Sequence, residues 1–455
     1  MKSIICLNSI YLLLFIAALS SCKSFVEVPP PTNQLDVNNV FTDDKTATAA
    51  IVGIYSDMEF SSPIGTYLTL LSGLSADELT YTAVDNGYFE FSTNTYTRDN
   101  HYAATVWAIY SNIYEANSCI LGIQNSIALS PNTKTQLLGE ARFSRAFCYF
   151  YLVNLFGDVP LVTSTDYRIN DTLRRTPSAQ VYQQIITDLM AAQTLLSSTY
   201  PTDQRVRPNA WTATALLSRV YLYTNKWAAA ESQATAIINS GLYTLSGLDS
   251  VFLNISNETI WQLMPVNPSF NTQEAAFFIP GSPTQIPVYP LTADLVNAFE
   301  SGDNRISVWT GYVIDGNDTL YYPYKYKISG GSPVNEYHIV FRLAEQYLIR
   351  AEARMQQANL KGAIMDINII RSRAGLKTLP VSLPLAQVAA AIQQERRIEL
   401  FAEFGHRWLD LKRTNKVGAV IGALKPSTWQ STDALWPVPQ DQRNANPFLT
   451  QNPGY

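Results

Sequence analysis

The sequence predicts a mainly α-helical protein, in which pairs of antiparallel helices form a scaffold and irregular, loop-rich segments form the ligand-binding portion. Three observations favour this class. Apolar residues recur at helical spacing, two helix hairpins resemble each other at a fixed offset, and the stretch between them is rich in proline, glycine and aromatic residues. Of 455 residues, 47% are hydrophobic and 15% are charged, which excludes wholesale disorder and a polytopic membrane protein.

The remaining composition narrows the class of ligand. Lys and Arg number 32 against 37 Asp and Glu, so the net charge of −5 argues against a broad nucleic-acid surface. Three histidines and four cysteines leave few ligands for a transition metal. Tyr is the most abundant aromatic residue, with 26 copies. A Tyr-rich surface of low charge suits neutral, partly apolar ligands.

The N-terminus carries an export signal. Lys2 precedes an apolar run at residues 10–19, which is too short for a permanent membrane span, and Leu19-Ser20-Ser21-Cys22 follows. This pattern resembles a bacterial lipoprotein signal, with 1–21 as the signal peptide and Cys22 as the lipidated residue. The alternative is an ordinary secretory signal with a chance cysteine at the cleavage site.

Helical periodicity dominates the rest of the chain. Within residues 135–156 the apolar face stops at Gly157, with Pro160 beyond, which is typical of a helix end. Another helix opens at Thr176-Pro177-Ser178, and Gly241 closes one further on. Further helices are expected at 104–129, 209–224, 227–240, 341–357, 361–373 and 385–404.

Two of the predicted hairpins look like copies of one unit. Aligning residues 218–237 with 351–370 matches apolar positions throughout, and small residues lie twelve apart in both copies, at Ser218 and Ala230 and at Ala351 and Ala363. Small side chains let antiparallel helices approach closely near their turn. The spacing matches the small positions of tetratricopeptide-like repeats.

Two segments break the helical pattern. Residues 242–340 contain short strand-like runs at 259–263 and 321–326 between many prolines, and loops of this length commonly carry function. Residues 79–102 are rich in aromatic and amide side chains and are not obviously helical. The predicted organisation is therefore a signal at 1–21, a helical region at 22–241, a loop-rich insertion at 242–340 and a helical region at 341–455.

Several motifs are expected to be structural. Glu395, Glu399 and Glu403 alternate with basic residues at helical spacing, which favours a salt-bridged helix over an acid–base pair. Arg142 and Arg145 are expected to pair with carboxylates between helices. Core packing is expected of Trp107, Tyr110 and Tyr114, and Cys119 and Cys148 are expected to be free, buried thiols, although an exported protein can bridge such a pair.

Signatures of catalysis are missing from the sequence. His101, His338 and His406 are far apart, and the sequence has no H-E-x-x-H, G-x-S-x-G or phosphate-loop motif. We therefore expect no metal, no cofactor and no enzymatic activity. A hydrolase stays the alternative, because two facing carboxylates of a glycosidase leave no sequence motif.

Residues 139–163, 341–353 and 395–413 closely resemble signatures of the SusD/RagB family, and the start of the mature chain and residues 289–305 are similar to it too. The resemblance implies a lipid-anchored, surface-exposed outer-membrane protein that binds a glycan and serves a TonB-dependent SusC-like transporter. It also implies a tetratricopeptide-like scaffold and no catalysis. The alternatives are a peptide-binding member of the same import system and a helical-repeat scaffold for protein partners.

The two irregular segments supply the candidate binding residues. A sugar ring packs its C–H face on an aromatic ring, and its hydroxyls need polar partners because buried polar groups must be paired. Residues 79–102 and 264–289 hold both kinds of group. The candidates are Tyr81, Asn86, Tyr88, Asn94, Tyr96, Arg98, Phe270, Phe277 and Tyr289. The alternative is that these rings fill the core beneath loops.

Overall fold

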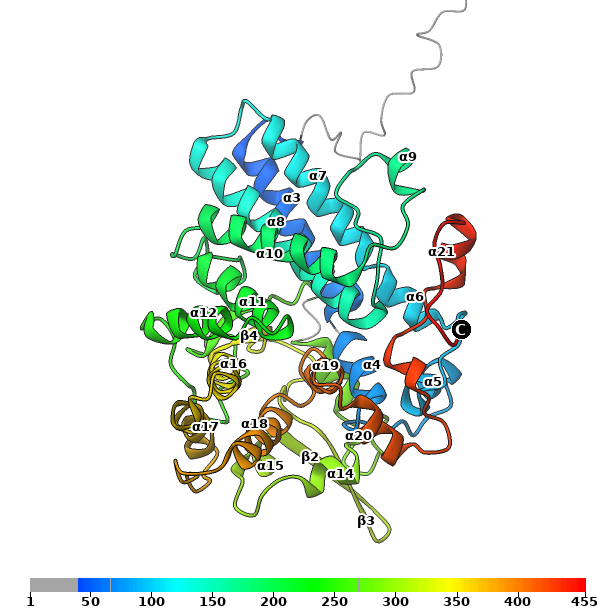
Figure 1. The fold of residues 1–455 in the computed structure, drawn as a ribbon, viewed down its shortest axis with the longest axis vertical. Helices are drawn as coiled ribbons and strands as arrows, with labels where there is room; N and C mark the ends of the chain where they lie inside the picture. The colour runs from blue at the N-terminus through cyan, green and yellow to red at the C-terminus, as the bar shows by residue number, and fades with distance from the viewer. Residues whose placement is uncertain (1–39, 66, 268–270) are drawn as a thin grey trace, which may run out of the picture.

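A computed structural model of the chain describes residues 40–65, 67–267 and 271–455 (Figure 1). The predictions for the signal peptide, Cys22 and Phe270 lie outside the described residues. The described elements, in chain order, are α3 (Asp44–Phe60), η2 (Pro63–Gly65), α4 (Tyr67–Ser75), α5 (Asn86–Thr93), α6 (His101–Trp107), α7 (Ile109–Asn125), α8 (Pro131–Phe156), α9 (Tyr167–Asn170), α10 (Ser178–Leu195), α11 (Ala210–Tyr223), α12 (Trp227–Asn239), β1 (Thr259–Leu263), α13 (Gln273–Phe278), α14 (Ala293–Asn297), α15 (Asn304–Trp309), β2 (Thr310–Asp315), β3 (Asp318–Pro323), β4 (His338–Arg342), α16 (Leu343–Gln356), α17 (Leu360–Arg373), α18 (Leu385–Glu399), α19 (His406–Arg413), α20 (Val417–Leu424), η3 (Ser431–Ala434) and α21 (Gln440–Ala445).

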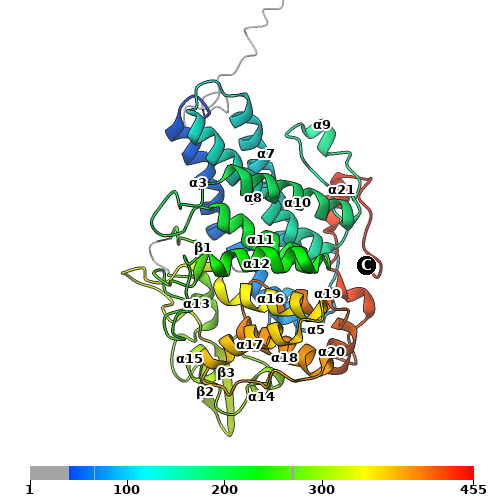
Figure 2. The ribbon, with the colours of Figure 1, turned by 60° about the vertical axis from the view of Figure 1, so that its left-hand side comes forward.

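The helices form a stack in which neighbours in sequence are mostly neighbours in space (Figures 1 and 2). From α7 the order runs through α8, α10, α11 and α12 to α16, α17 and α18, each packing on the next, while α3 covers α7 and α8. This arrangement confirms the predicted mainly α-helical, helix-pair fold.

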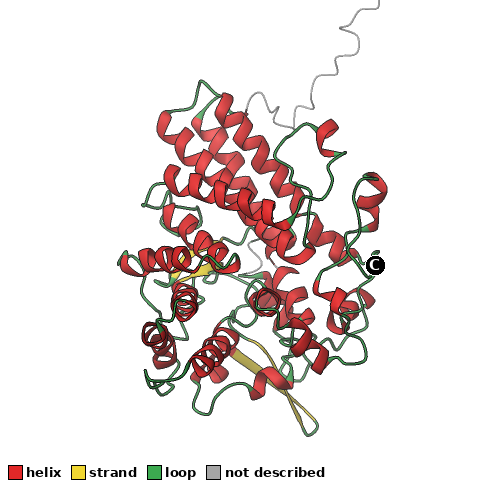
Figure 3. Ribbon diagram, in the orientation of Figure 1, coloured by secondary structure: helices red, strands yellow, loops and turns green. Residues whose placement is uncertain are grey.

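The two hairpins that resemble each other in sequence are α11–α12 and α16–α17. Their four small residues, Ser218, Ala230, Ala351 and Ala363, are completely buried, and α12 packs directly on α16. Residues 242–340 therefore leave the stack after α12 and return to it at α16. As predicted, this excursion contains only short elements within its described residues (Figure 3).

Helix α8 shows how local sequence sets the boundaries of the elements. The Ser130 side chain accepts a hydrogen bond from the Thr133 amide, Pro131 occupies the first turn, and Gly157 ends the helix with φ of +75°. At Gly139 a Cβ would lie 2.8 Å from the Leu196 side chain, so a glycine lets the end of α10 approach.

Several predicted boundaries need correction. The helix expected at 104–129 is divided into α6 and α7 at Ala108. Phe341 and Arg342, expected in a helix, belong to β4, because pairing with β1 overrides their local preference. Helix α18 ends at Glu399, and Ala402, Phe404 and Gly405 then take positive φ values. The second strand-like run ends at Pro323.

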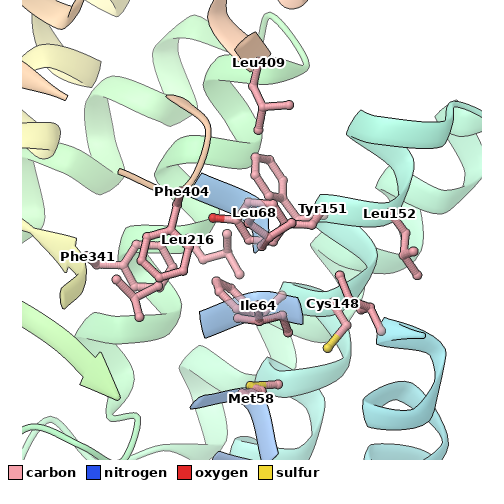
Figure 4. Packing of buried hydrophobic residues seen from close by; sticks show 14 of the residues in the cluster. Met58, Ile64, Leu68, Cys148, Tyr151, Leu152, Leu216, Phe341, Phe404 and Leu409 are labelled. Carbon is pink, nitrogen blue, oxygen red and sulfur yellow. The ribbon is translucent and has the colours of Figure 1, made fainter. Parts of the chain in front are cut away.

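One continuous hydrophobic core joins the helical stack to residues 242–340. Met58 of α3, Cys148 and Tyr151 of α8 and Phe341 of β4 gather there with Phe404, and each is buried (Figure 4). Side chains more than 300 residues apart in sequence thus stabilise one unit. As predicted, Cys119 and Cys148 are free and buried.

The predicted structural role of Glu395, Glu399 and Glu403 is confirmed, but Glu403 lies beyond the end of α18. The arginine partners come from α15, β4 and α17 and not from the same helix. Glu395, Glu399 and Glu403 are nearly inaccessible, and each pairs with arginine: Arg305 Nη1 lies 2.6 Å from Glu395 Oε1, and Arg342 Nε lies 2.8 Å from Glu403 Oε2. Paired arginines hold the pKa of Glu399 far below its usual value against the opposing effect of burial. These carboxylates therefore form buried ion pairs within the interior of the protein.

The other structural predictions are mostly confirmed. Arg142 and Arg145 both bind Asp188, with Arg145 Nη2 at 2.7 Å from Asp188 Oδ1. Trp107 is buried and Tyr110 is partly buried, but Tyr114 is 53% exposed, so its predicted core role is wrong. Across the described ranges, we find no helix long and apolar enough to cross a membrane.

Candidate glycan-binding site

The two irregular segments that the sequence singles out lie side by side. Leu79 and Leu291 form an antiparallel bridge, the Thr80 amide donates to the Pro290 carbonyl, and the Thr82 amide donates to the Val288 carbonyl. Residues 79–82 and 287–291 thus lie side by side as one short antiparallel ribbon.

Beneath this ribbon lies a closed ring of six aromatic side chains, which we call the aromatic ring. The ring centroids of neighbouring side chains lie between 3.9 and 6.5 Å apart. Tyr88 stacks on Tyr102 at a centroid distance of 3.9 Å, and Tyr81 stacks on Tyr289 at 5.7 Å. The six members, in order round the ring, are Tyr67, Tyr102, Tyr88, Tyr81, Tyr289 and Phe277. Offset and tilted pairs of this kind stabilise by about 1 kcal/mol each beyond burial, so the ring is a rigid platform.

Burial acts on the hydroxyl groups of three members of the aromatic ring. Burial, assisted by the neighbouring Asp85, raises the pKa of Tyr102 to about 12, and burial raises the pKa of Tyr88 and Tyr289 further. The Asp85 amide donates to the Tyr81 hydroxyl at 2.8 Å, while Asp85 Oδ1 accepts from the amides of Gly87 and Tyr88 at the start of α5. The hydroxyls of Tyr88, Tyr102 and Tyr289 are therefore neutral.

Exposed apolar and amide side chains belong to the same two segments as most of the aromatic ring, and we call them the rim. Val84 is 96% exposed, Phe89 is 55% exposed and Ile286 is 44% exposed, and the amides of Asn86 and Gln285 are exposed near them in the chain. Soluble proteins expose such groupings of large apolar side chains mainly at binding surfaces. The rim combines flat or branched apolar groups with amide donors and acceptors, as a neutral sugar requires.

Four of the predicted residues belong to the aromatic ring, and they differ in how far their side chains are buried. Tyr81 and Phe277 are partly buried and keep accessible surface, whereas Tyr88 and Tyr289 are 7% and 4% exposed. The prediction of direct ligand contact by Tyr88 and Tyr289 is therefore corrected, because their rings lie under their neighbours and support the platform. Asn86, the first residue of α5, is exposed as expected.

Asn94 and Tyr96 are interior residues, which corrects their predicted role. Asn94 ends α5 in the left-handed conformation with no exposed surface, and its amide donates to the Ser75 carbonyl and to the Tyr96 hydroxyl. Tyr96 is 5% exposed and packs on Phe91. Arg98 is exposed beside Asp99 and belongs to neither the aromatic ring nor the rim.

The predicted candidates leave out several members of the aromatic ring and the rim, among them Tyr67, Tyr102 and Phe89. Tyr67 comes from α4, outside both irregular segments, and no local signal marks it. Tyr102 and Phe89 lie within 79–102, but the helices there were not foreseen. The signal for them was present, because Asp85 and Asn100 are N-cap residues of α5 and α6.

The arrangement favours binding over chemistry. The aromatic ring and the rim consist of aromatic, aliphatic and amide side chains. The nearest carboxylate, that of Asp85, caps the N-terminus of α5. Within the described residues, no group of three or more His, Cys, Asp or Glu side chains is placed to hold a metal ion. The fold and site together define a helical-repeat protein in which a cluster of packed aromatic side chains belongs largely to the same segments as exposed apolar and amide side chains.

Comparison with known proteins identifies the family. A family described as "SusD family" matches residues 301–455, and one described as "Starch-binding associating with outer membrane" matches residues 64–222. A SusD-like protein of Formosa agariphila is 26% identical, with 98% of each chain covered, and one of Bacteroides ovatus is 25% identical, with 90% of this chain and 82% of the other covered. The chain belongs to the SusD/RagB family.

Solved structures share the fold. A SusD superfamily protein from Bacteroides vulgatus superposes with a TM-score of 0.81 at 21% identity, covering 91% of this chain and all of the other. A structure described as a laminarin-binding SusD-like protein superposes with a TM-score of 0.76 at 24% identity, with the same coverage. At these identities the likeness establishes the fold, and the nature of the ligand is argued separately.

Proposed function

We propose that this protein binds a neutral oligosaccharide or polysaccharide on the surface formed by the aromatic ring and the rim, and does not alter it. The observation that carries the proposal is the meeting of the two irregular segments, which places exposed apolar and amide side chains beside a rigid aromatic platform. A starch-binding description of the matching family and a laminarin-binding structural relative support a glucan as the ligand class.

The proposed cellular setting is the outer membrane. We propose that Cys22 carries the lipid anchor, that the protein is exposed at the cell surface, and that it delivers its glycan to a TonB-dependent SusC-like transporter. The family description, with its reference to the outer membrane, supports the location. Mass spectrometry of the native protein tests the anchor, and co-purification with the transporter tests the partner.

Titration calorimetry with residues 23–455 tests the ligand class. A panel of starch- and laminarin-type oligosaccharides should include saturable binders, and a panel of peptides should not. Binding of peptides with no binding of glycans would refute the proposal in favour of a peptide-importing member. Release of reducing ends from a bound polysaccharide by the pure protein would show a hydrolase instead.

A further inference from the structure

The face formed by α3 and α7 carries an apolar groove far from the aromatic ring in sequence. It consists of two hollows, of about 600 and 450 Å³, that share Phe41, Tyr114 and Ser118 in their walls. Apolar groups dominate the walls, including Val40, Ala50, Gly53, Ile54, Phe60, Cys119, Leu121, Gly122, Ile127, Ala128 and Val266. We call this pair of hollows the α3–α7 groove.

Large apolar side chains of the groove are open to solvent. Phe60 and Tyr114 are each 53% exposed, Leu121 is 48% exposed and Ile127 is fully exposed. Of the two hollows, only the larger is lined by charged residues, Asp57 and Glu115, and burial together with the nearby Asp57 raises the pKa of Glu115. An apolar surface of this extent indicates an apolar occupant.

One aromatic side chain of the protein, that of Phe41, lies in the α3–α7 groove. At Gly122 a Cβ would lie 2.1 Å from the Phe41 ring, so the ring rests directly on the backbone of α7. Phe41 lines both hollows. The groove therefore suits an apolar ligand. The described side chains do not fill the two hollows.

The position of the groove relates it to the proposed lipid. Val40, the first described residue, lines the larger hollow, and Cys22 lies only eighteen residues before it. Eighteen residues reach at most about 65 Å when fully extended, and a short tether of this kind gives an attached group a millimolar effective concentration. An acyl chain on Cys22 is therefore always within reach of the groove.

We infer that the α3–α7 groove shelters an acyl chain of the protein's own N-terminal lipid, an inference that rests on the proposed lipidation of Cys22. At about 30 Å³ for each heavy atom, the share of one liquid water, a sixteen-carbon chain needs roughly 480 Å³. Either hollow is of that size. The groove would cover the chain whenever it is outside a bilayer, as during export through an aqueous compartment.

Glycine at position 53 allows a direct test. No atom lies within 4 Å of a Cβ built on Gly53, which lines the larger hollow from within α3, so Gly53→Leu adds an apolar side chain at the wall of the groove, starting from open space. Gly418 of α20 is equally open and lies outside the groove, so Gly418→Leu is the matched control. Leucine is also the better helix former at both positions.

The measurement is binding of a neutral fluorescent monoacylglycerol with a chain of about sixteen carbons to unlipidated residues 22–455. We expect one saturable site, affinity at least tenfold weaker in Gly53→Leu, and no change in Gly418→Leu. Probe binding that is absent or equal in both variants would overturn the inference.

A second experiment tests whether an alkyl chain attached to Cys22 is the ligand of the groove. Because Cys119 lines the larger hollow, this experiment uses a Cys119→Ala background. Cys148 is completely buried, and burial raises the pKa of its thiol, so a hexadecyl maleimide is then directed to Cys22. The alkylated protein should bind the probe at least tenfold more weakly than the unmodified protein, because its own chain fills the groove. Equal binding would exclude the tethered chain as the occupant. Mass spectrometry of the native protein tests lipidation separately, so failure of that proposal is distinguishable from failure of this one.

Discussion

Replacing Phe89 by alanine should weaken glycan binding about tenfold without destabilising the protein. Phe89 stands on the outer side of α5, beside the aromatic ring, and is 55% exposed. An aromatic side chain offers about 200 Å² of surface, so roughly 110 Å² is open to solvent. A sugar that packs on one face covers about half of this area. At about 25 cal/mol per Å² the lost contact is about 1.4 kcal/mol, or tenfold in Kd.

The assay is titration calorimetry of wild-type and variant residues 23–455 with the strongest oligosaccharide of the panel. Tyr167→Ala is the matched control, because Tyr167 is 70% exposed on α9, outside the ring and rim. The free energy of unfolding should change by less than about 0.5 kcal/mol in either variant, since both side chains are largely exposed. An unchanged Kd for Phe89→Ala, or an equal loss in the control, would refute the reasoning.

Three further predictions concern the interior. Burial and the neighbouring Asp77 raise the pKa of Glu78 to about 8 from 4.5, so stability is lost as pH rises from about 4.5 to 8, and at pH 7 the loss is on the order of 3 kcal/mol. Glu78→Gln should therefore flatten the pH dependence of urea unfolding; an unaltered profile would contradict the assignment. Asp188→Ala leaves Arg145 buried and unpaired and should cost about 3–5 kcal/mol, whereas a loss below 1 kcal/mol would show that solvent reaches the arginine. Ala363→Leu overpacks the α16–α17 contact and should lower stability by about 1–3 kcal/mol in the same assay; a neutral result would mean that the repeat packing is loose.

Sequence periodicity predicted the scaffold well because its helices are amphipathic and bury a regular stripe. Ala363 and Ala351 could be assigned to a close helix contact from spacing alone, and both are fully buried. The exceptions occurred where distant pairing overrides local preference. Phe341 carries helix-compatible sequence but joins β4, because β1 supplies its hydrogen bonds from about 80 residues away.

The candidate site was predictable as a region and less so as a set of residues. The composition of 79–102 and 264–289 marked both segments, and their pairing then explains why the two signals belong together. Composition does not tell which ring faces outward. Tyr88 and Phe89 are adjacent in sequence, yet the turn of α5 buries the first and exposes the second. Tyr67 reaches the aromatic ring from α4 through tertiary packing, which no local pattern encodes.

A crystal structure of residues 23–455 with a bound oligosaccharide tests the central proposal most directly. The proposal predicts a sugar ring packed against Phe89 and Tyr81, with its hydroxyls bonded to the amides of Asn86 or Gln285. A ligand bound elsewhere on the helical stack, with the rim left bare, would contradict it.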